Sequence, residues 1–199
     1  MASKKNSIEE FEFSDVPYLI AVPEEAEVLH KPSVLVDVAE YKQIESFHKL
    51  IVRLKELAKT STDNVCGVSA IQLGIPFSMF VLQHKGTCAT YINPQIQKME
   101  DYKLFVETSL SSPGKQYLTI RANEIEVFYT TPLGQVVGVR LGGQLSAVFQ
   151  QMVDSLVGVQ LGDEDSPFME YTKDIQYLTE EQINELTQTM QNALRKRKK

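Results

Sequence analysis

Apolar residues at intervals of three and four predict a helix in the first third of the chain. The positions are Ile44, Phe47, Ile51, Leu54 and Ala58, within residues 38–60. This spacing places the apolar side chains in one stripe along a helix, and such a stripe is buried against the rest of a domain. We therefore expect residues 38–60 to form one helix that faces the core.

Short β-prone stretches separated by glycine, proline and asparagine fill the middle of the chain. They cover residues 78–82, 89–92, 118–120, 125–129 and 135–140. The last two stretches flank the segment TTPLG at 130–134, which is typical of a hairpin turn because proline presets φ and glycine accepts a positive φ. The pattern predicts a middle region made mostly of strands.

Two further helices are expected in the second half of the chain. The first covers residues 144–158, with apolar residues at Leu145, Val148, Phe149, Met152 and Leu156. The second starts with the capping box TEEQ at 179–182 and carries a stripe at Ile183, Leu186, Met190 and Leu194. Because this stripe spans less than three heptads, packing on the chain's own domain and a coiled coil with a partner both stay open.

Charge and cysteine content narrow the class of protein. The formal net charge is −6, although residues 195–199 are all basic. An acidic body repels phosphate backbones, so we expect no nucleic-acid partner except through a contact of this tail. No stretch fits a signal peptide or a membrane span, and Cys66 and Cys88 are typical of reduced thiols. We expect a cytoplasmic protein without a membrane partner, or part of a particle assembled in the cytoplasm, such as a virion.

Considered without any family resemblance, the sequence shows no known arrangement of catalytic residues. The histidines His30, His48 and His84 stand apart from one another, so no helical pair of histidines can hold a divalent metal. The sequence also lacks a phosphate-binding loop, a nucleophile elbow and a C-x-x-C pair. We accordingly expect no cofactor and no metal.

Three segments nevertheless resemble, in order, the signature motifs of the peptide deformylase family. Residues 65–74 (VCGVSAIQLG) resemble G-x-G-L-A-A-x-Q-x-G, residues 107–114 (ETSLSSPG) resemble E-G-C-L-S-x-P-G, and residues 149–158 (FQQMVDSLVG) resemble Q-H-E-x-D-H-L-x-G. The resemblance covers roughly residues 27–160. It implies an α+β fold in which mostly antiparallel sheets pack around a central helix. The N-terminal extension and the C-terminal helix that we expect beside this fold lie outside the resemblance.

The resemblance also implies an altered site. In the family, the cysteine of the second motif and both histidines of the third hold a catalytic iron or zinc ion, and the glutamate of the third relays protons. By position, the cysteine becomes Ser109, the histidines become Gln151 and Ser155, and the glutamate becomes Met152. Hydroxyl and amide groups are poor ligands for these metals, and methionine cannot transfer a proton. We therefore expect a chain that is not an enzyme, with a neutral hydrogen-bonding network at the former metal position.

Other family positions are retained. Gln72 and Leu110 match the residues whose side-chain amide and backbone N–H stabilise the oxyanion in the family. Glu107 opens the second motif, and we expect its buried carboxylate to accept backbone N–H bonds.

We expect three parts: an N-terminal extension (1–27), a deformylase-like domain (28–163), and a linker with an amphipathic, basic-ended helix (164–199). The favoured function is a structural or protein-interaction scaffold in a multi-subunit assembly, for example a phage tail or baseplate. The alternatives are a metal-dependent or altered hydrolase acting on peptide ends, and a binder of peptide ends that does not cleave them. The expected contact residues are Phe11, Phe13, Tyr18, Ile183, Leu186, Met190 and Leu194.

Overall fold

The computed structural model describes residues 27–163, 169–170, 181, 184–185 and 188. Its helical elements are η2 (Glu27–His30), α1 (Val38–Tyr41), α2 (Glu45–Thr60), η3 (Ala70–Leu73) and α3 (Gln144–Leu156). Its strands are β1 (Val65–Ser69), β2 (Met79–His84), β3 (Thr87–Ser109), β4 (Ser112–Thr130), β5 (Val136–Gly142) and β6 (Met169–Glu170). None of the helices in this part of the chain is long and apolar enough to cross a membrane.

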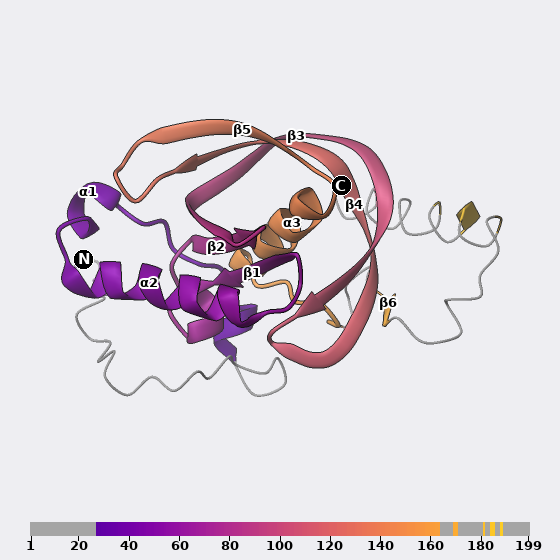
Figure 1. Ribbon diagram of the computed structural model, residues 1–199, viewed down its shortest axis with the longest axis horizontal. Coiled ribbons are helices and arrows are strands. Elements are labelled where there is room, and N and C mark those ends of the chain that lie inside the picture. The colour runs from indigo at the N-terminus through magenta and orange to yellow at the C-terminus, as the bar shows by residue number, and fades with distance from the viewer. Residues whose placement is uncertain (1–26, 164–168, 171–180, 182–183, 186–187, 189–199) are drawn as a thin grey trace.

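The described strands form one antiparallel sheet in the order β1-β2-β3-β4-β5, with β6 paired to β4 beside this path. The register of β3 and β4 shifts at three places, near Ile92, Ile96 and Glu107, where bulges bend and twist the strand pair. The pair curves around α3, which packs against β1 to β5 (Figure 1). The predicted α+β fold, with antiparallel strands around a central helix, is confirmed.

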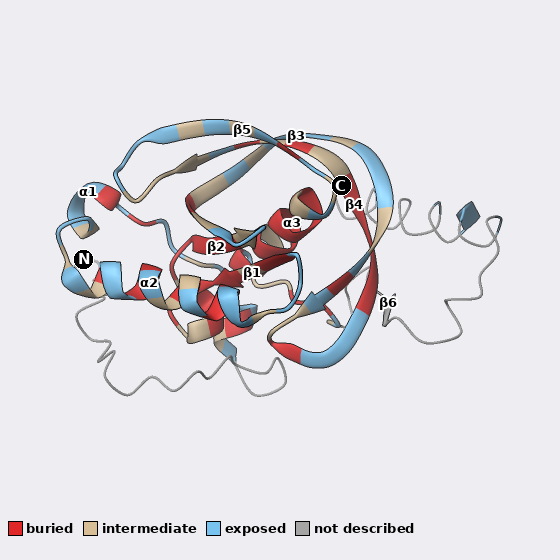
Figure 2. Cartoon of the chain, in the orientation of Figure 1, coloured by how far each residue is buried: buried red, intermediate tan, exposed pale blue. Residues whose placement is uncertain are grey.

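The core consists of two apolar clusters on opposite faces of β2. Met79 and Val81 belong to the cluster under α2, whereas Phe80 and Leu82 belong to the cluster under α3. Successive side chains of a strand point to opposite faces, so a strand covered on both faces is apolar throughout. Figure 2 shows the result: buried residues gather on β1, β2 and the inner side of α3, while β5 is largely exposed.

The prediction of one helix over residues 38–60 is wrong, because the chain forms two helices, α1 and α2, separated by residues 42–44. Asp37 caps α1, and its Oδ1 accepts a hydrogen bond from the Ala39 backbone N–H at 2.9 Å. Ile44 is extended, with φ −90° and ψ 122°, and α2 begins after it. Ile44 continues the apolar spacing across the break, so periodicity alone does not detect it. The buried stripe of α2 includes Phe47, Ile51, Leu54 and Ala58, as predicted.

The predicted hairpin turn and second helix are confirmed. The backbone N–H of Thr131 donates to the carbonyl of Gln135 at 2.8 Å, and Gly134 has a φ of +85°. The second predicted helix corresponds to α3, which ends at Leu156 rather than at residue 158. The third predicted helix, over residues 179–199, falls almost entirely outside the described residues.

Candidate functional site

The site residues predicted from the resemblance lie around two spaces beside α3. A small cavity of about 10 Å³ is bordered by Gln72, Ser109, Gln151, Met152 and Ser155, among others. Leu110 lines a larger groove of about 460 Å³, which Gln151 also borders. Residues from three distant motifs therefore meet at adjoining spaces. The small cavity has room for about one water molecule.

Gln72 is fixed by a local capping box at the start of η3. Its Oε1 accepts a hydrogen bond from the Ser69 backbone N–H at 2.9 Å, and its Nε2 donates to Ser111 Oγ at 2.8 Å. Gly74 then ends η3 with a φ of +76°, a conformation that favours glycine. Both ends of the buried amide thus have partners, which holds it in one orientation.

Two α3 side chains complete a neutral polar network. Ser155 Oγ donates to the Met152 carbonyl at 2.7 Å and lies 3.2 Å from Ser69 Oγ. Gln151 Nε2 donates to the Thr108 carbonyl at 2.9 Å, which ties α3 to the end of β3. These groups are buried and hydrogen-bonded to one another or to backbone, as buried polar groups need to be.

Met152 belongs to the apolar core as well as to the border of the small cavity. Its side chain is 2% exposed and joins the cluster under α3. A Cβ atom added to Gly67 of β1 would lie only 2.7 Å from both Cγ and Sδ of Met152. Position 67 therefore has to be glycine for α3 to approach β1 this closely, because any side chain there would overlap the Met152 thioether.

Gly67→Ala is expected to lower the free energy of unfolding by about 1–3 kcal/mol, because the added methyl group overlaps Met152 in a packed core. The same substitution is expected to cost less in a Met152→Ala background, where Cγ and Sδ are absent. Urea unfolding of the wild type, both single variants and the double variant measures this coupling. An equal cost in both backgrounds would contradict the predicted overlap.

A buried ion-pair network adjoins the site, and two of its members, Arg121 and Asp154, line the small cavity. Arg121 of β4 donates from Nε and Nη2 to the Glu107 carboxylate at 3.1–3.3 Å, and from Nη1 to Asp154 of α3. The Glu107 side chain has 0% exposure and that of Arg121 has 6%. Glu107 thus accepts hydrogen bonds from Arg121 rather than from the backbone N–H groups expected. Burial raises the pKa of Glu107, although the Arg121 charge opposes the rise.

The sequence contains one signal that points to this network. Arg121, Glu107 and Asp154 are charged residues set within stretches that are otherwise apolar enough to be buried. Buried charges are almost always paired, so three of them in such stretches indicate a shared partner set. Which residue pairs with which depends on the β3–β4 register.

The residues at the family's metal positions do not fit an iron or zinc ion. Ser109 and Ser155 offer hydroxyl groups and Gln151 offers an amide, and none of these is a strong ligand for either metal. Gln151 Nε2 and the Ser155 hydroxyl already donate hydrogen bonds to backbone carbonyls. No group of three or more His, Cys, Asp or Glu side chains among the described residues is placed to hold a metal. No metal-dependent step is therefore assigned to these residues.

The larger groove lies along β1, an edge of the sheet. β1 pairs with β2 on one side, and no described strand pairs with its other side. Val65, Cys66 and Gly67 of β1 line the groove, and so do residues of β3, β4 and α3. Burial raises the pKa of the Cys66 thiol to about 11, so the thiol stays protonated at neutral pH and is a poor nucleophile. The groove can therefore bind a chain along β1, and Cys66 does not provide a reactive thiolate.

Two curated relatives show what the chain is similar to. A peptide deformylase of Picosynechococcus sp. is 32% identical over 116 residues, which are 55% of this chain and 62% of the relative. A peptide deformylase of Dictyoglomus turgidum is 29% identical over 125 residues, which are 61% of this chain and 81% of the relative. The match thus spans about three fifths of the length of the first relative.

These relatives bear on the prediction that the chain is not an enzyme. Both carry the name of an enzyme, peptide deformylase, and a third relative, from Carboxydothermus hydrogenoformans, carries it too. The prediction relied only on the residue types at four motif positions. The comparisons contradict it, and the prediction is wrong.

Solved structures and a protein-family model agree on the family. The chain matches peptide deformylase from Thermotoga maritima with a TM-score of 0.64 and 30% identity, over 71% of this chain and 92% of that one. A peptide deformylase from Legionella pneumophila matches 91% of this chain and 96% of its own with a TM-score of 0.63, and its 19% identity shows the fold alone. The family model for polypeptide deformylase matches residues 19–170. Because this match spans more than half of the chain, the chain belongs to the polypeptide deformylase family.

Proposed function

We propose that this chain binds the N-terminal end of an extended peptide in the groove along β1. The observation that carries the proposal is the free edge of β1, with which no strand in the described part of the chain pairs, and whose residues Val65, Cys66 and Gly67 line that groove. An extended peptide can add to such an edge through backbone hydrogen bonds, while neighbouring side chains give selectivity. A groove of about 460 Å³ has the size of ordinary ligand pockets.

The small cavity supports recognition of a chain end. It shares Gln151 with the groove and accommodates a group about the size of one water molecule. Ser109, Arg121 and Asp154 are among the residues that border it, and their polar groups suit a small polar group at the end of a chain, such as the oxygen of a formyl group. The name of the relatives supports the same ligand class, and a peptide deformylase from Acinetobacter baumannii has been solved with Met-Ala-Ser bound.

Calorimetric titration of the full chain with formyl-Met-Ala-Ser tests the proposal. We expect saturable binding, and we expect Leu110→Trp, which fills part of the groove, to raise Kd by about tenfold. Leu35→Trp is the matched control, because Leu35 is 76% exposed and does not line the groove. Formate release, assayed in the same samples, records whether the bound peptide is also cleaved.

Two results of this titration would contradict the proposal. One is a lack of binding by the wild-type chain. The other is an equal loss of affinity in both tryptophan variants, which would indicate that the indole acts without filling the groove.

The scaffold role in an assembly or virion stays a separate prediction, as do the boundaries of the three expected parts and the cytoplasmic location. The residues expected to make the scaffold contacts all lie outside the described residues. They are Phe11, Phe13, Tyr18, Ile183, Leu186, Met190 and Leu194.

A further inference from the structure

We infer that the groove along β1 prefers a peptide that carries a positive charge, and that Asp63 selects it; this inference rests on the proposed function. Two of the lining residues are charged, Asp63 and Glu107, and both are carboxylates. No lysine, arginine or histidine in the described part of the chain lines the groove. A groove lined by charges of one sign attracts ligands of the other sign.

The two carboxylates differ in what they offer a ligand. Glu107 is fully buried, and Arg121 already pairs with it. Asp63 is exposed, and within the described residues no cation pairs with it. The charge that a bound peptide would meet is therefore that of Asp63.

Asp63 is held in position by contacts on two sides. It lies in the connection between α2 and β1, where its backbone N–H donates to Ser61 Oγ at 3.1 Å. Its Oδ2 accepts a hydrogen bond from the Thr108 hydroxyl at 3.1 Å, and the Thr108 carbonyl in turn accepts from Gln151. The carboxylate is thus tied to the end of β3 and, through it, to α3, rather than swinging freely in solvent.

The charge of Asp63 also acts inside the groove. Burial is the main cause of the raised pKa of the Cys66 thiol, and the Asp63 carboxylate adds to it. Cys66 lies on β1 beside the proposed path of the peptide. A cationic group along that path would meet the same negative potential.

A peptide series measures the preference directly. Amidated peptides derived from formyl-Met-Ala-Ser-Ala carry lysine, norleucine or glutamate at the second, third or fourth residue, and each is titrated into the full chain. At one position we expect lysine to bind about two- to fivefold tighter than norleucine, the range of an exposed ion pair, with glutamate weaker than both. The preference should shrink in ~1 M salt, where the Debye length is about 3 Å.

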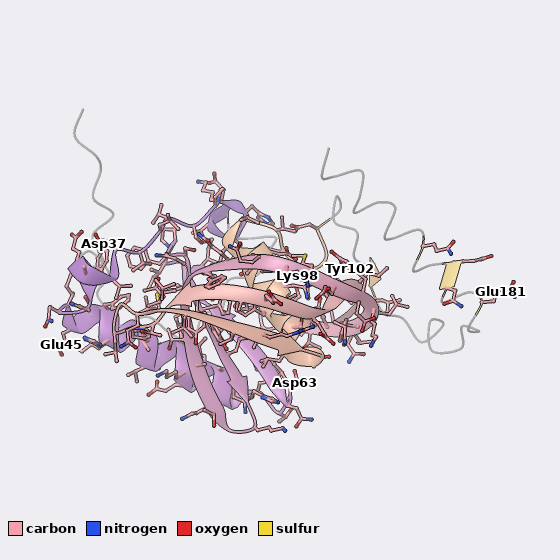
Figure 3. The ribbon with its side chains drawn as sticks, turned by 90° about the horizontal axis from the view of Figure 1, so that it is seen from above. Asp37, Glu45, Asp63, Lys98, Tyr102 and Glu181 are labelled. Atoms are coloured by element: carbon pink, nitrogen blue, oxygen red, sulfur yellow. The ribbon has the colours of Figure 1, made fainter. Side chains whose placement is uncertain are left out.

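Asp63→Asn tests the assigned residue. Asparagine keeps the shape and the oxygen that accepts from Thr108, so only the charge is lost. We expect this variant to bind lysine and norleucine peptides equally, with unchanged affinity for the norleucine peptide. Asp37→Asn is the matched control, since asparagine caps a helix about as well as aspartate, and Asp37 lies on a different part of the molecule from Asp63 (Figure 3).

The outcomes separate this inference from the proposed function. If neutral peptides bind but lysine and norleucine peptides bind equally at every position, the charge preference is wrong and the proposed function stands. A lysine preference that survives in Asp63→Asn would overturn the role of Asp63. If no peptide binds, the proposed function fails and this inference fails with it. Tighter peptide binding after deletion of residues 195–199 would assign the groove to the chain's own basic tail instead.

Discussion

Arg121→Met is expected to lower the free energy of unfolding by about 3–5 kcal/mol, because it leaves the Glu107 carboxylate buried without its partner. The Glu107 side chain has 0% exposure, so bulk water does not solvate the carboxylate once the guanidinium is gone. Methionine keeps most of the volume, which limits the effect to lost charge and hydrogen bonds. Urea unfolding at neutral pH measures the change.

The control for this prediction is Arg140→Met. Arg140 pairs with Glu124 and Glu100 on the exposed side of the sheet, with 60% of its side chain accessible. An exposed pair contributes about 0–1 kcal/mol, so this variant should stay close to the wild type. Similar losses in Arg121→Met and Arg140→Met would contradict the assignment of Arg121 as a buried partner.

The loss in free energy of unfolding caused by Arg121→Met should also depend on pH. Burial already raises the pKa of folded Glu107, and removal of the Arg121 charge raises it further. The folded variant then binds a proton that the unfolded chain releases, so its stability rises relative to the wild type as the pH falls. We therefore expect the difference in free energy of unfolding between the wild type and Arg121→Met to be larger near pH 8 than near pH 5. Adding Glu107→Gln should remove this pH dependence, because the titrating group is gone.

Phe149→Ala is expected to lower the free energy of unfolding by about 3–5 kcal/mol, since it leaves a cavity at the centre of the cluster under α3. Phe149 has 0% exposure, and its ring meets those of Phe80 and Tyr91 edge-on at centroid distances of 5.1 and 5.2 Å. These edge-to-face contacts add to the loss of buried area. Thermal and urea unfolding both report the effect.

Phe128→Ala provides the matched control for Phe149→Ala. The chemical change is identical, but the Phe128 ring is 45% exposed on β4. Its removal leaves much less of a cavity, so the loss should be less than half as large. A loss in Phe149→Ala no greater than in Phe128→Ala would show that α3 is not anchored through this ring.

Local features of the fold were predictable because they depend on residues close together in the chain. The stripe on α3 and the turn around Gly134 follow from short-range spacing and from the φ preferences of proline and glycine. The break before α2 was not predictable in the same way, since Ile44 keeps the periodic pattern while its backbone is extended. The predicted stretches cover only parts of β3 and β4, because segments of these strands such as residues 97–103 and 112–116 are mostly polar and carry no clear strand signal.

The candidate site likewise has features that the sequence predicted and features that it did not. Motif order placed Gln72, Ser109 and Gln151 at one site, and the structure puts them around one cavity. The contact of Met152 with Gly67 was not predictable, because it requires α3 to cross β1 at close range. The partners of Arg121 were not predictable either, because they depend on how β3 and β4 are paired.

The sequence by itself determined α3, the apolar stripe of α2, the hairpin, the family motifs and the residue types at the site. Only the tertiary structure decided that Arg121 neutralises Glu107, 14 residues away, and that Asp63 meets Thr108, 45 residues away, at the groove. Strand register and helix crossing bring such residues together. Both arise from packing of the whole chain, which no local pattern of residues encodes.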